Sequence, residues 1–167
     1  IIATAKDKAV KAVDNERTIM YWNIGKRIFE EEQQGKDRAD YGSYLIKFLS
    51  EQLLPEYGTG FSVRQLERYR QFYRTFPIAT TLWTQLSWSQ YKLLLAVDNQ
   101  DKREFYIAET VKNNWTVRQL ERQINSSLYE RLLMSSDRKD VLAVARNEKL
   151  PSDAREIIKD PMFLEFL

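Results

Sequence analysis

The sequence contains no cysteine and no histidine, only four prolines and five glycines, and no long apolar run. Without thiols or imidazoles, the chain can form no disulfide, no thiolate or imidazole metal site, and no Ser–His or Cys–His catalytic pair. No segment approaches the roughly 18 apolar residues that a membrane span requires, and no signal-peptide pattern opens the chain. We therefore expect a cytoplasmic protein with no cofactor, no metal, no membrane partner and no small-molecule substrate.

The residues that are present suffice for a globular fold. The chain has 167 residues, of which 43% are hydrophobic and 13% aromatic, a composition that argues against a disordered or collagen-like chain. Helical periodicity runs throughout, and few windows alternate apolar with polar residues, so we predict an all-α, multi-helix fold. The start at Ile1, without Met, suggests a domain cut from a longer protein.

Apolar spacing and capping signals predict the positions of the helices. Ser–x–x–Gln or Thr–x–x–Gln capping boxes precede three of them, and Asp98 is expected to cap a fourth. In the second helix we expect an inward face of Tyr44, Leu45, Phe48, Leu49 and Leu53, and the acidic run 30–32 is expected to be a solvated face. The predicted helices cover residues 4–34, 38–54, 62–76, 87–97, 100–113, 116–134 and 137–146.

Positive charge is concentrated in two short segments. The net charge is only +2, from 26 basic and 24 acidic residues. Residues 58–74, however, hold four arginines against one glutamate, a local charge of +3, and residues 116–134 hold three basic residues against two acidic ones, a local charge of +1. A local basic stripe can attract an anionic partner even on a nearly neutral protein, although arginines also solvate ordinary helix faces.

The same two segments contain a repeated hexapeptide. The sequence VRQLER occurs at Val63–Arg68 and again at Val117–Arg122, each time preceded by an aromatic and a hydroxyl residue. The hydroxyl and the glutamine of each copy can form a capping box, and the aromatic residue can pack as a hydrophobic staple. One interpretation is therefore two well-capped helices and nothing more.

The residues around each copy favour a second interpretation, because they segregate onto two helix faces. When the residues are placed on a helix of 3.6 residues per turn, the apolar residues lie on one face in both copies. The opposite face carries two arginines, an amide and a hydroxyl residue, in that order. The inward residues are Val63, Leu66, Tyr69, Phe72, Tyr73 and Phe76 in the first copy, and Val117, Leu120, Ile124 and Leu128 in the second. The outward residues are Arg64, Arg68, Gln71 and Thr75, and Arg118, Arg122, Asn125 and Tyr129.

Guanidinium and carboxamide groups in a row are typical of nucleic-acid recognition. Arg can bind guanine or phosphate through two parallel hydrogen bonds, and Gln or Asn can pair with adenine. Each repeat helix also follows another predicted helix across a short turn, which is the layout of a helix-turn-helix. We therefore predict two helix-turn-helix-like units that bind nucleic acid, most simply double-stranded DNA. An alternative is a protein-interaction or oligomerisation module whose long first helix pairs with a partner.

Four ordered segments resemble the N-terminal helical domain of the YhcG family. They are YGSYLIKFLSEQL at Tyr41–Leu53, GFSVRQLERYRQFYRTFP at Gly60–Pro77, LSWSQYKLLLAVDN at Leu86–Asn99 and REFYIAETVKNNWTVRQLERQI at Arg103–Ile124, and the closing DPMFLEFL at Asp160–Leu167 also fits. Residues 86–122 are also similar to the helix-turn-helix region of ParB-like partition proteins, where a leucine-rich helix, a turn and a hydroxyl-capped helix follow one another.

The YhcG resemblance implies a function for the chain as part of a larger protein. In that family the helical domain precedes a PDDEXK nuclease-like domain, in proteins associated with restriction and mobile elements. The present sequence lacks the corresponding motif, because its only (Asp/Glu)-x-Lys match, Asp137–Lys139, lies in a predicted helix without strand pattern. The resemblance thus implies a non-catalytic, DNA-targeting part of a bacterial nuclease.

The sequence predicts a domain organisation and a set of nucleic-acid contact residues. Residues 1–135 would form the helical domain with its two helix-turn-helix-like units, and residues 136–167 would form a helical extension toward the nuclease domain. A homo-oligomer is also possible, since such domains often dimerise to bind two half-sites. The predicted nucleic-acid contacts are Arg64, Arg68, Gln71, Arg118, Arg122 and Asn125, with Arg70 and Arg74 as phosphate clamps.

Overall fold

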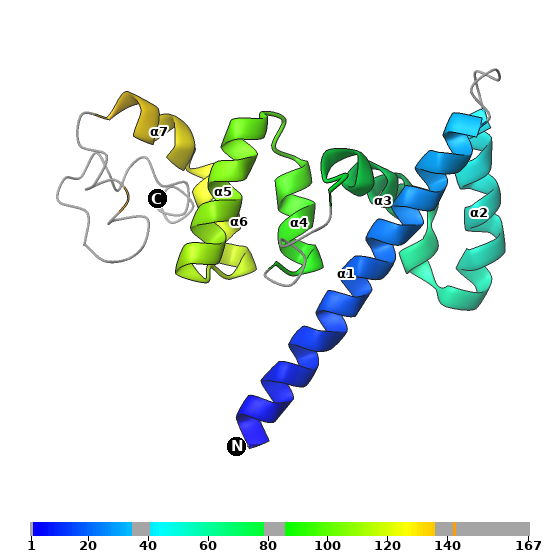
Figure 1. The fold of residues 1–167 in the computed structure, drawn as a ribbon, viewed down its shortest axis with the longest axis horizontal. Helices are drawn as coiled ribbons and strands as arrows, with labels where there is room; N and C mark the ends of the chain where they lie inside the picture. The colour runs from blue at the N-terminus through cyan, green and yellow to red at the C-terminus, as the bar shows by residue number, and fades with distance from the viewer. Residues whose placement is uncertain (1, 35–40, 79–85, 136–141, 143–167) are drawn as a thin grey trace, which may run out of the picture. The chain divides into compact units, whose positions relative to one another are not determined.

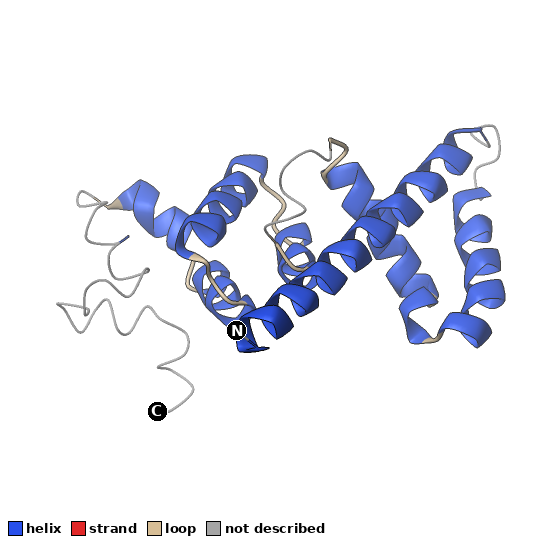
Figure 2. Ribbon diagram, turned by 60° about the horizontal axis from the view of Figure 1, so that its bottom comes forward, coloured by secondary structure: helices blue, strands red, loops and turns tan. Residues whose placement is uncertain are grey.

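The protein is all-α, as predicted, in a computed structural model that describes residues 2–34, 41–78, 86–135 and 142 (Figure 1). Helices account for every regular element of the described part, and only short loops join them (Figure 2). The elements are α1 (Ile2–Gln34), α2 (Tyr41–Tyr57), a single 3₁₀ turn η1 (Thr59–Phe61), α3 (Val63–Thr75), α4 (Trp88–Leu95), α5 (Gln100–Asn113), α6 (Val117–Asn125) and α7 (Leu128–Met134).

The chain divides into two compact units, with the boundary inside α4. The first unit, Ile1–Tyr91, contains α1, α2, η1 and α3, and the second, Lys92–Leu167, contains α5, α6 and α7. The first copy of the hexapeptide thus begins α3 in the first unit, and the second copy begins α6 in the second. No helix in the described ranges combines the length and the apolar character that crossing a bilayer would require.

The first unit is built on a close crossing of α1 and α3. Its centre is a cluster of the fully buried side chains Ile28, Ile46, Leu66 and Tyr69. The Tyr69 ring stacks on Tyr21 of α1 with 4.3 Å between ring centroids, and the Tyr69 hydroxyl donates a 2.9 Å hydrogen bond to the carbonyl of Gly60. Burial raises the pKa of Tyr69, so this hydroxyl stays protonated and able to donate.

Polar contacts also join α1 to α3 and to the residue that follows it. The Trp22 Nε1–H of α1 donates a 2.7 Å hydrogen bond to the carbonyl of Phe76, the residue that follows α3. Toward the C-terminal end of α1, Arg70 Nη1 of α3 lies 2.5 Å from Glu32 Oε1. Glu32 is therefore not part of a solvated face, as the sequence suggested, but is largely buried against a neighbouring helix, with its side chain 16% exposed.

Helix α2 differs from its prediction both in its end and in its buried face. Pro55 lies inside the helix, which continues to Tyr57, whereas we expected Pro55 to end it. Tyr44 and Phe48 were predicted to point inward but are 67% and 45% exposed, and Ile46 is buried instead. Tertiary packing against α1 and α3 therefore selects a narrower face of α2 than apolar character alone indicates.

The second unit contains a helix break that the sequence did not predict. The apolar periodicity indicated one helix over 116–134, but Ser127 adopts a left-handed backbone with φ 52°, and the chain divides there into α6 and α7. Tyr106 of α5 stabilises the break because its buried hydroxyl donates to the carbonyl of Gln123 (3.1 Å) and accepts from the backbone N–H of Tyr129 (3.4 Å). Both backbone groups belong to helix ends, where intrahelical partners are missing.

We predict that Tyr106→Phe destabilises the second unit. The variant keeps the ring but removes the hydroxyl that joins α6 to α7, and leaving a buried backbone group without its partner costs about 1–3 kcal/mol. Urea unfolding followed by circular dichroism measures the loss. Tyr129→Phe is the control, with an expected change within about 0.5 kcal/mol, because the half-buried Tyr129 packs through its ring against Phe105. Equal stability of Tyr106→Phe and the parent chain would contradict this account of the break.

The capping predictions have mixed outcomes. The boxes at Ser87–Gln90 and Thr116–Gln119 form as predicted, with a 2.8 Å hydrogen bond from the backbone N–H of Ser87 and of Thr116 to the glutamine Oε1 in each. Asn99, not Asp98, caps α5, since its side chain accepts from the backbone N–H of Lys102 at 2.9 Å. The predicted helix over 137–146 lies almost entirely outside the described residues.

Candidate nucleic-acid interface

A tight turn sets the start of α3. Gly58 has φ 81°, a backbone conformation that favours glycine, and η1 follows directly. Phe61 then packs against the core cluster that includes Leu66, as the predicted staple requires. The predicted capping box does not form here, because the Ser62 side chain makes no cap hydrogen bond. Gln65 Oε1 instead lies 3.5 Å from Arg68 Nη1, one turn along the helix.

The face of α3 away from the core is polar and basic. Arg64, Gln71 and Arg74 are exposed, and Arg68 is half-buried. With Arg70, Thr75 and the single acid Glu67, these side chains line a depression of about 770 Å³. Four arginines against one glutamate give this surface a strong positive character within a 13-residue helix. A phosphate backbone is attracted to such a surface.

The arginines of this face are not equivalent. Arg70 is held by Glu32 of α1, and its side chain is only 27% exposed. Binding of a phosphate by Arg70 would have to compete with this partly buried ion pair. Arg64 and Arg74 are exposed to solvent, so a phosphate could bind them without displacing a partly buried carboxylate.

The second copy of the hexapeptide begins α6 after a short, well-defined turn. Asn114 ends α5 in the left-handed conformation with φ 50°, and Trp115 and Leu120 are both buried. Thr116 then caps α6: its Oγ1 accepts from the backbone N–H of Gln119 at 3.3 Å, and Gln119 Oε1 accepts from the backbone N–H of Thr116. The arrangement of two helices joined by Asn114–Thr116 thus arises from local sequence signals.

The outward face of α6 matches that of α3 in its first three positions. Arg118 is exposed like Arg64, Arg122 is half-buried like Arg68, and Asn125 is exposed like Gln71. The fourth position differs. Tyr129 lies on α7, beyond the helix break, and packs on Phe105 with 5.5 Å between ring centroids. The repeat therefore preserves an Arg–Arg–amide series in both units, but not the hydroxyl.

Sequence reasoning missed two features near this surface. The ion pair between Arg70 and Glu32 joins residues 38 positions apart, and no local pattern indicates it. Val63, assigned to the inward face, is 40% exposed at the start of α3. Because helix ends fray, the exposure of Val63 in the first turn of α3 could have been predicted. The ion pair between Arg70 and Glu32 could not.

Comparison with known proteins identifies the family. Residues 1–131 match the model of the DUF1016 N-terminal domain. The whole chain aligns, at 37% identity over 202 positions, with "Putative nuclease YhcG" of Escherichia coli (strain K12) and covers 53% of that protein, so the chain spans about half the length of this relative. No solved structure matches the chain significantly. The matched range includes both hexapeptides, and the chain therefore belongs to the family of the DUF1016 N-terminal domain, which includes the N-terminal part of YhcG.

Proposed function

We propose that this chain is a non-catalytic DNA-binding domain that positions a nuclease domain of the same polypeptide. The observation that carries the proposal is the basic outward face of α3, where Arg64, Arg68 and Arg74 surround Gln71 on a rigid, packed helix. Arginines on a regular helix can contact phosphates and base edges at fixed spacing. The side chains that would contact DNA are thus separate from those that form the core.

In the second unit, α5, its turn and α6 would act as a helix-turn-helix. In such motifs the second helix enters the major groove with its N-terminal residues against the bases. Arg118 and Arg122 lie in the first six residues of α6, and Asn125 ends it. We infer that these three side chains contact DNA in the same manner as their counterparts on α3.

The proposal that a nuclease domain belongs to the same polypeptide rests on the similarity to YhcG. That protein is named as a nuclease, and the present chain corresponds to about half of its length. In this proposal the catalytic PDDEXK-type domain belongs to the part of the protein beyond the present chain. Residues 136–167 would connect the two domains.

The affinity for duplex DNA and its dependence on salt test the proposal. Counterion release predicts that the logarithm of the binding constant falls linearly with the logarithm of salt concentration, with a slope of about −0.9 per phosphate contacted. Four to six contacts across the two faces would give a slope of roughly −4 to −5. Fluorescence anisotropy with labelled duplexes between 50 and 200 mM salt measures it, with single-stranded DNA and RNA as competitors. No binding of duplex DNA at 50 mM salt would contradict the proposal.

A second candidate function, a protein-interaction module, is favoured by a different observation. Residues 2–6 and 8–13 of α1 are all exposed, and the helix extends past α2 and α3 (Figure 1). The exposed apolar side chains of this segment, Ile2, Val10 and Val13, can serve as an association surface. Protein association would use the exposed part of α1 and DNA binding would use the outward face of α3, so the two functions are compatible.

A further inference from the structure

Within the described residues of the first unit, residues 2–6 and 8–13 of α1 are all exposed. The helix has 33 residues and is about 50 Å long, but only its second half packs against α3. In the first half Ile2, Val10 and Val13 are 85%, 55% and 64% exposed. Isolated helices of 12–15 residues are marginal in water, so this arm (residues 2–13) gains little stability on its own.

Apolar residues recur as a stripe along one face of α1, beginning in the arm, where the charged Lys6 lies between Ile2 and Ala9 on the same face. Ile2, Ala9, Val13, Met20 and Ile24 follow one another at spacings of seven and four residues, which places them on one helix face. The first helix was predicted from the spacing of Ala9, Val13, Met20, Ile24 and Ile28, and in the structure Val13 and Met20 are exposed. Thr18 and Trp22 are buried on another face of α1, whereas Ile28, four residues after Ile24, continues the stripe and is buried in the core cluster.

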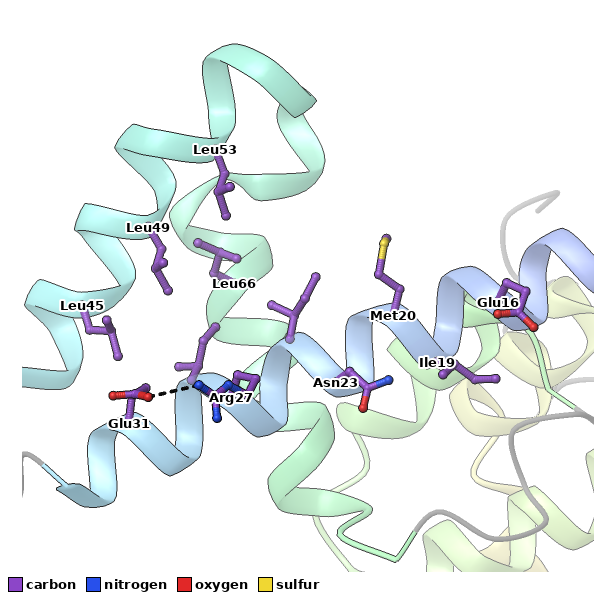
Figure 3. A pocket seen from close by; sticks show the side chains of 12 residues that line it. Glu16, Ile19, Met20, Asn23, Arg27, Glu31, Leu45, Leu49, Leu53 and Leu66 are labelled. Atoms are coloured by element: carbon purple, nitrogen blue, oxygen red, sulfur yellow. Dashed lines mark hydrogen bonds and ion pairs between the residues drawn. The ribbon is translucent and has the colours of Figure 1, made fainter.

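An apolar groove lies between the second half of α1 and α2. Its volume is about 700 Å³, and its walls and floor are formed by Met20, Ile24, Leu45, Leu49, Leu53 and Leu66. Figure 3 shows Leu45, Leu49 and Leu53 of α2 in a row facing α1, with Leu66 of α3 behind them. The three leucines are spaced by four residues, so they present a single ridge to whatever fills the groove.

The arm and the groove are complementary in length and in charge. Along α1 the groove extends from Glu16 to Glu31, about 22 Å, whereas the arm is about 18 Å long. The arm carries Lys6, Lys8 and Lys11 against Asp7, a net charge of +2. Among the described residues that line the groove, Glu16 and Glu31 lie at its ends and Arg27, which bonds to Glu31, is the one cation, so the lining has a net charge of −1 (Figure 3).

We propose that two copies of this chain associate through this surface, with the arm of each copy in the α1–α2 groove of the other. The arm and one wall of the groove belong to the same helix, α1. When two α1 helices lie antiparallel about a twofold axis, the arm of each copy therefore lies in the groove of the other. The same patch is then used by both subunits, and the assembly closes as a dimer. Each arm gains apolar contacts for Ile2 and Val13, which are exposed within the described part of the first unit.

Sedimentation equilibrium on the whole chain tests the proposal. We expect a dimer, and we expect the double variant Ala9→Glu/Val13→Glu to raise its dissociation constant by about 100-fold, because two carboxylates would be buried in the interface. The control is Val10→Glu, at a position off the stripe, and it is matched in charge by the single variant Val13→Glu, because each adds one carboxylate to the same arm. Val10→Glu should change the dissociation constant only slightly. Ala9, Val10 and Val13 are all exposed, so folding should be retained.

A cross-linking experiment locates the contact independently of affinity. The chain has no cysteine, so any disulfide that forms must involve the introduced thiols. Chains carrying Val13→Cys are mixed with chains carrying Leu45→Cys, Leu49→Cys or Leu53→Cys, and at least one pair should form a disulfide-linked heterodimer, which requires Cα atoms within about 7 Å. Lys112→Cys, on α5, is the control. A monomeric chain at 100 µM, a dimer insensitive to the arm variant, or no specific cross-link would overturn the proposal.

Discussion

Replacing Arg64, Arg68 and Arg74 together by glutamine is expected to weaken binding to duplex DNA by about 100-fold or more at 50 mM salt. Each arginine that contacts a phosphate or a base contributes on the order of 1–3 kcal/mol to the binding free energy, and the three contributions are lost together. The salt dependence should also fall, by about 2–3 in slope, because three fewer counterions are released. Glutamine keeps much of the side-chain length and a hydrogen-bonding end, so the variant tests charge more than shape.

The control for this variant removes the same charge elsewhere. Lys47, Lys92 and Lys112 are exposed on α2, α4 and α5, and their replacement by glutamine changes the net charge equally. If both triple variants lose affinity to the same extent, binding depends on overall charge and not on the α3 face. The double variant Arg118→Gln/Arg122→Gln then tests the second face, with an expected loss of about 10-fold or more.

Gly25→Ala is expected to destabilise the first unit by about 3 kcal/mol or more. A methyl group at this position would lie 1.9 Å from the carbonyl oxygen of Tyr69 and 3.2 Å from the backbone nitrogen of Arg70. These are backbone atoms of α3, so the two helices must separate, with loss of the Tyr21–Tyr69 stack and the Arg70–Glu32 ion pair. Overpacking of this kind usually costs 1–3 kcal/mol, and a clash with helix backbone lies at the upper end.

The sign of the effect makes this prediction diagnostic. At an exposed helix position, glycine to alanine stabilises by about 0.5–1 kcal/mol, so any loss at Gly25 reports the close approach of α1 and α3. Gly60→Ala is the matched control, because its added methyl would meet only the Tyr69 hydroxyl at 3.9 Å. Urea unfolding of both variants measures the difference. A Gly25→Ala chain as stable as the parent would mean that the helices cross elsewhere.

Local sequence patterns predicted most of the helices and the position of the repeat. The range 100–113 agrees with α5 at both ends, and α1 and α3 agree within two residues at each end. These helices begin or end at signals that act within a few residues, such as the caps and the proline after Phe76. The exposure of Arg64, Gln71, Arg118 and Asn125 also followed from helix periodicity alone.

Features that depend on a second segment were not predictable in this way. The end of α6 is determined by a hydroxyl of α5, and the burial of Glu32 is determined by Arg70 of α3. The exposure of Tyr44 and Phe48 follows from the angle at which α2 meets its neighbours. In each case the partner lies far away in sequence, and periodicity carries no information about distant partners.

The amino-acid sequence by itself determined that this protein is all-α, where most of its helices start, and which arginines and amides lie on the polar faces of α3 and α6. Caps, turns and the 3.6-residue repeat are local interactions, so the sequence encodes them locally. Only the tertiary structure decided that Gly25 brings two helices together, that Arg70 is held by Glu32, and that the stripe of α1 faces outward beside an apolar groove. These properties arise from the packing of segments distant in sequence, which no single helix specifies.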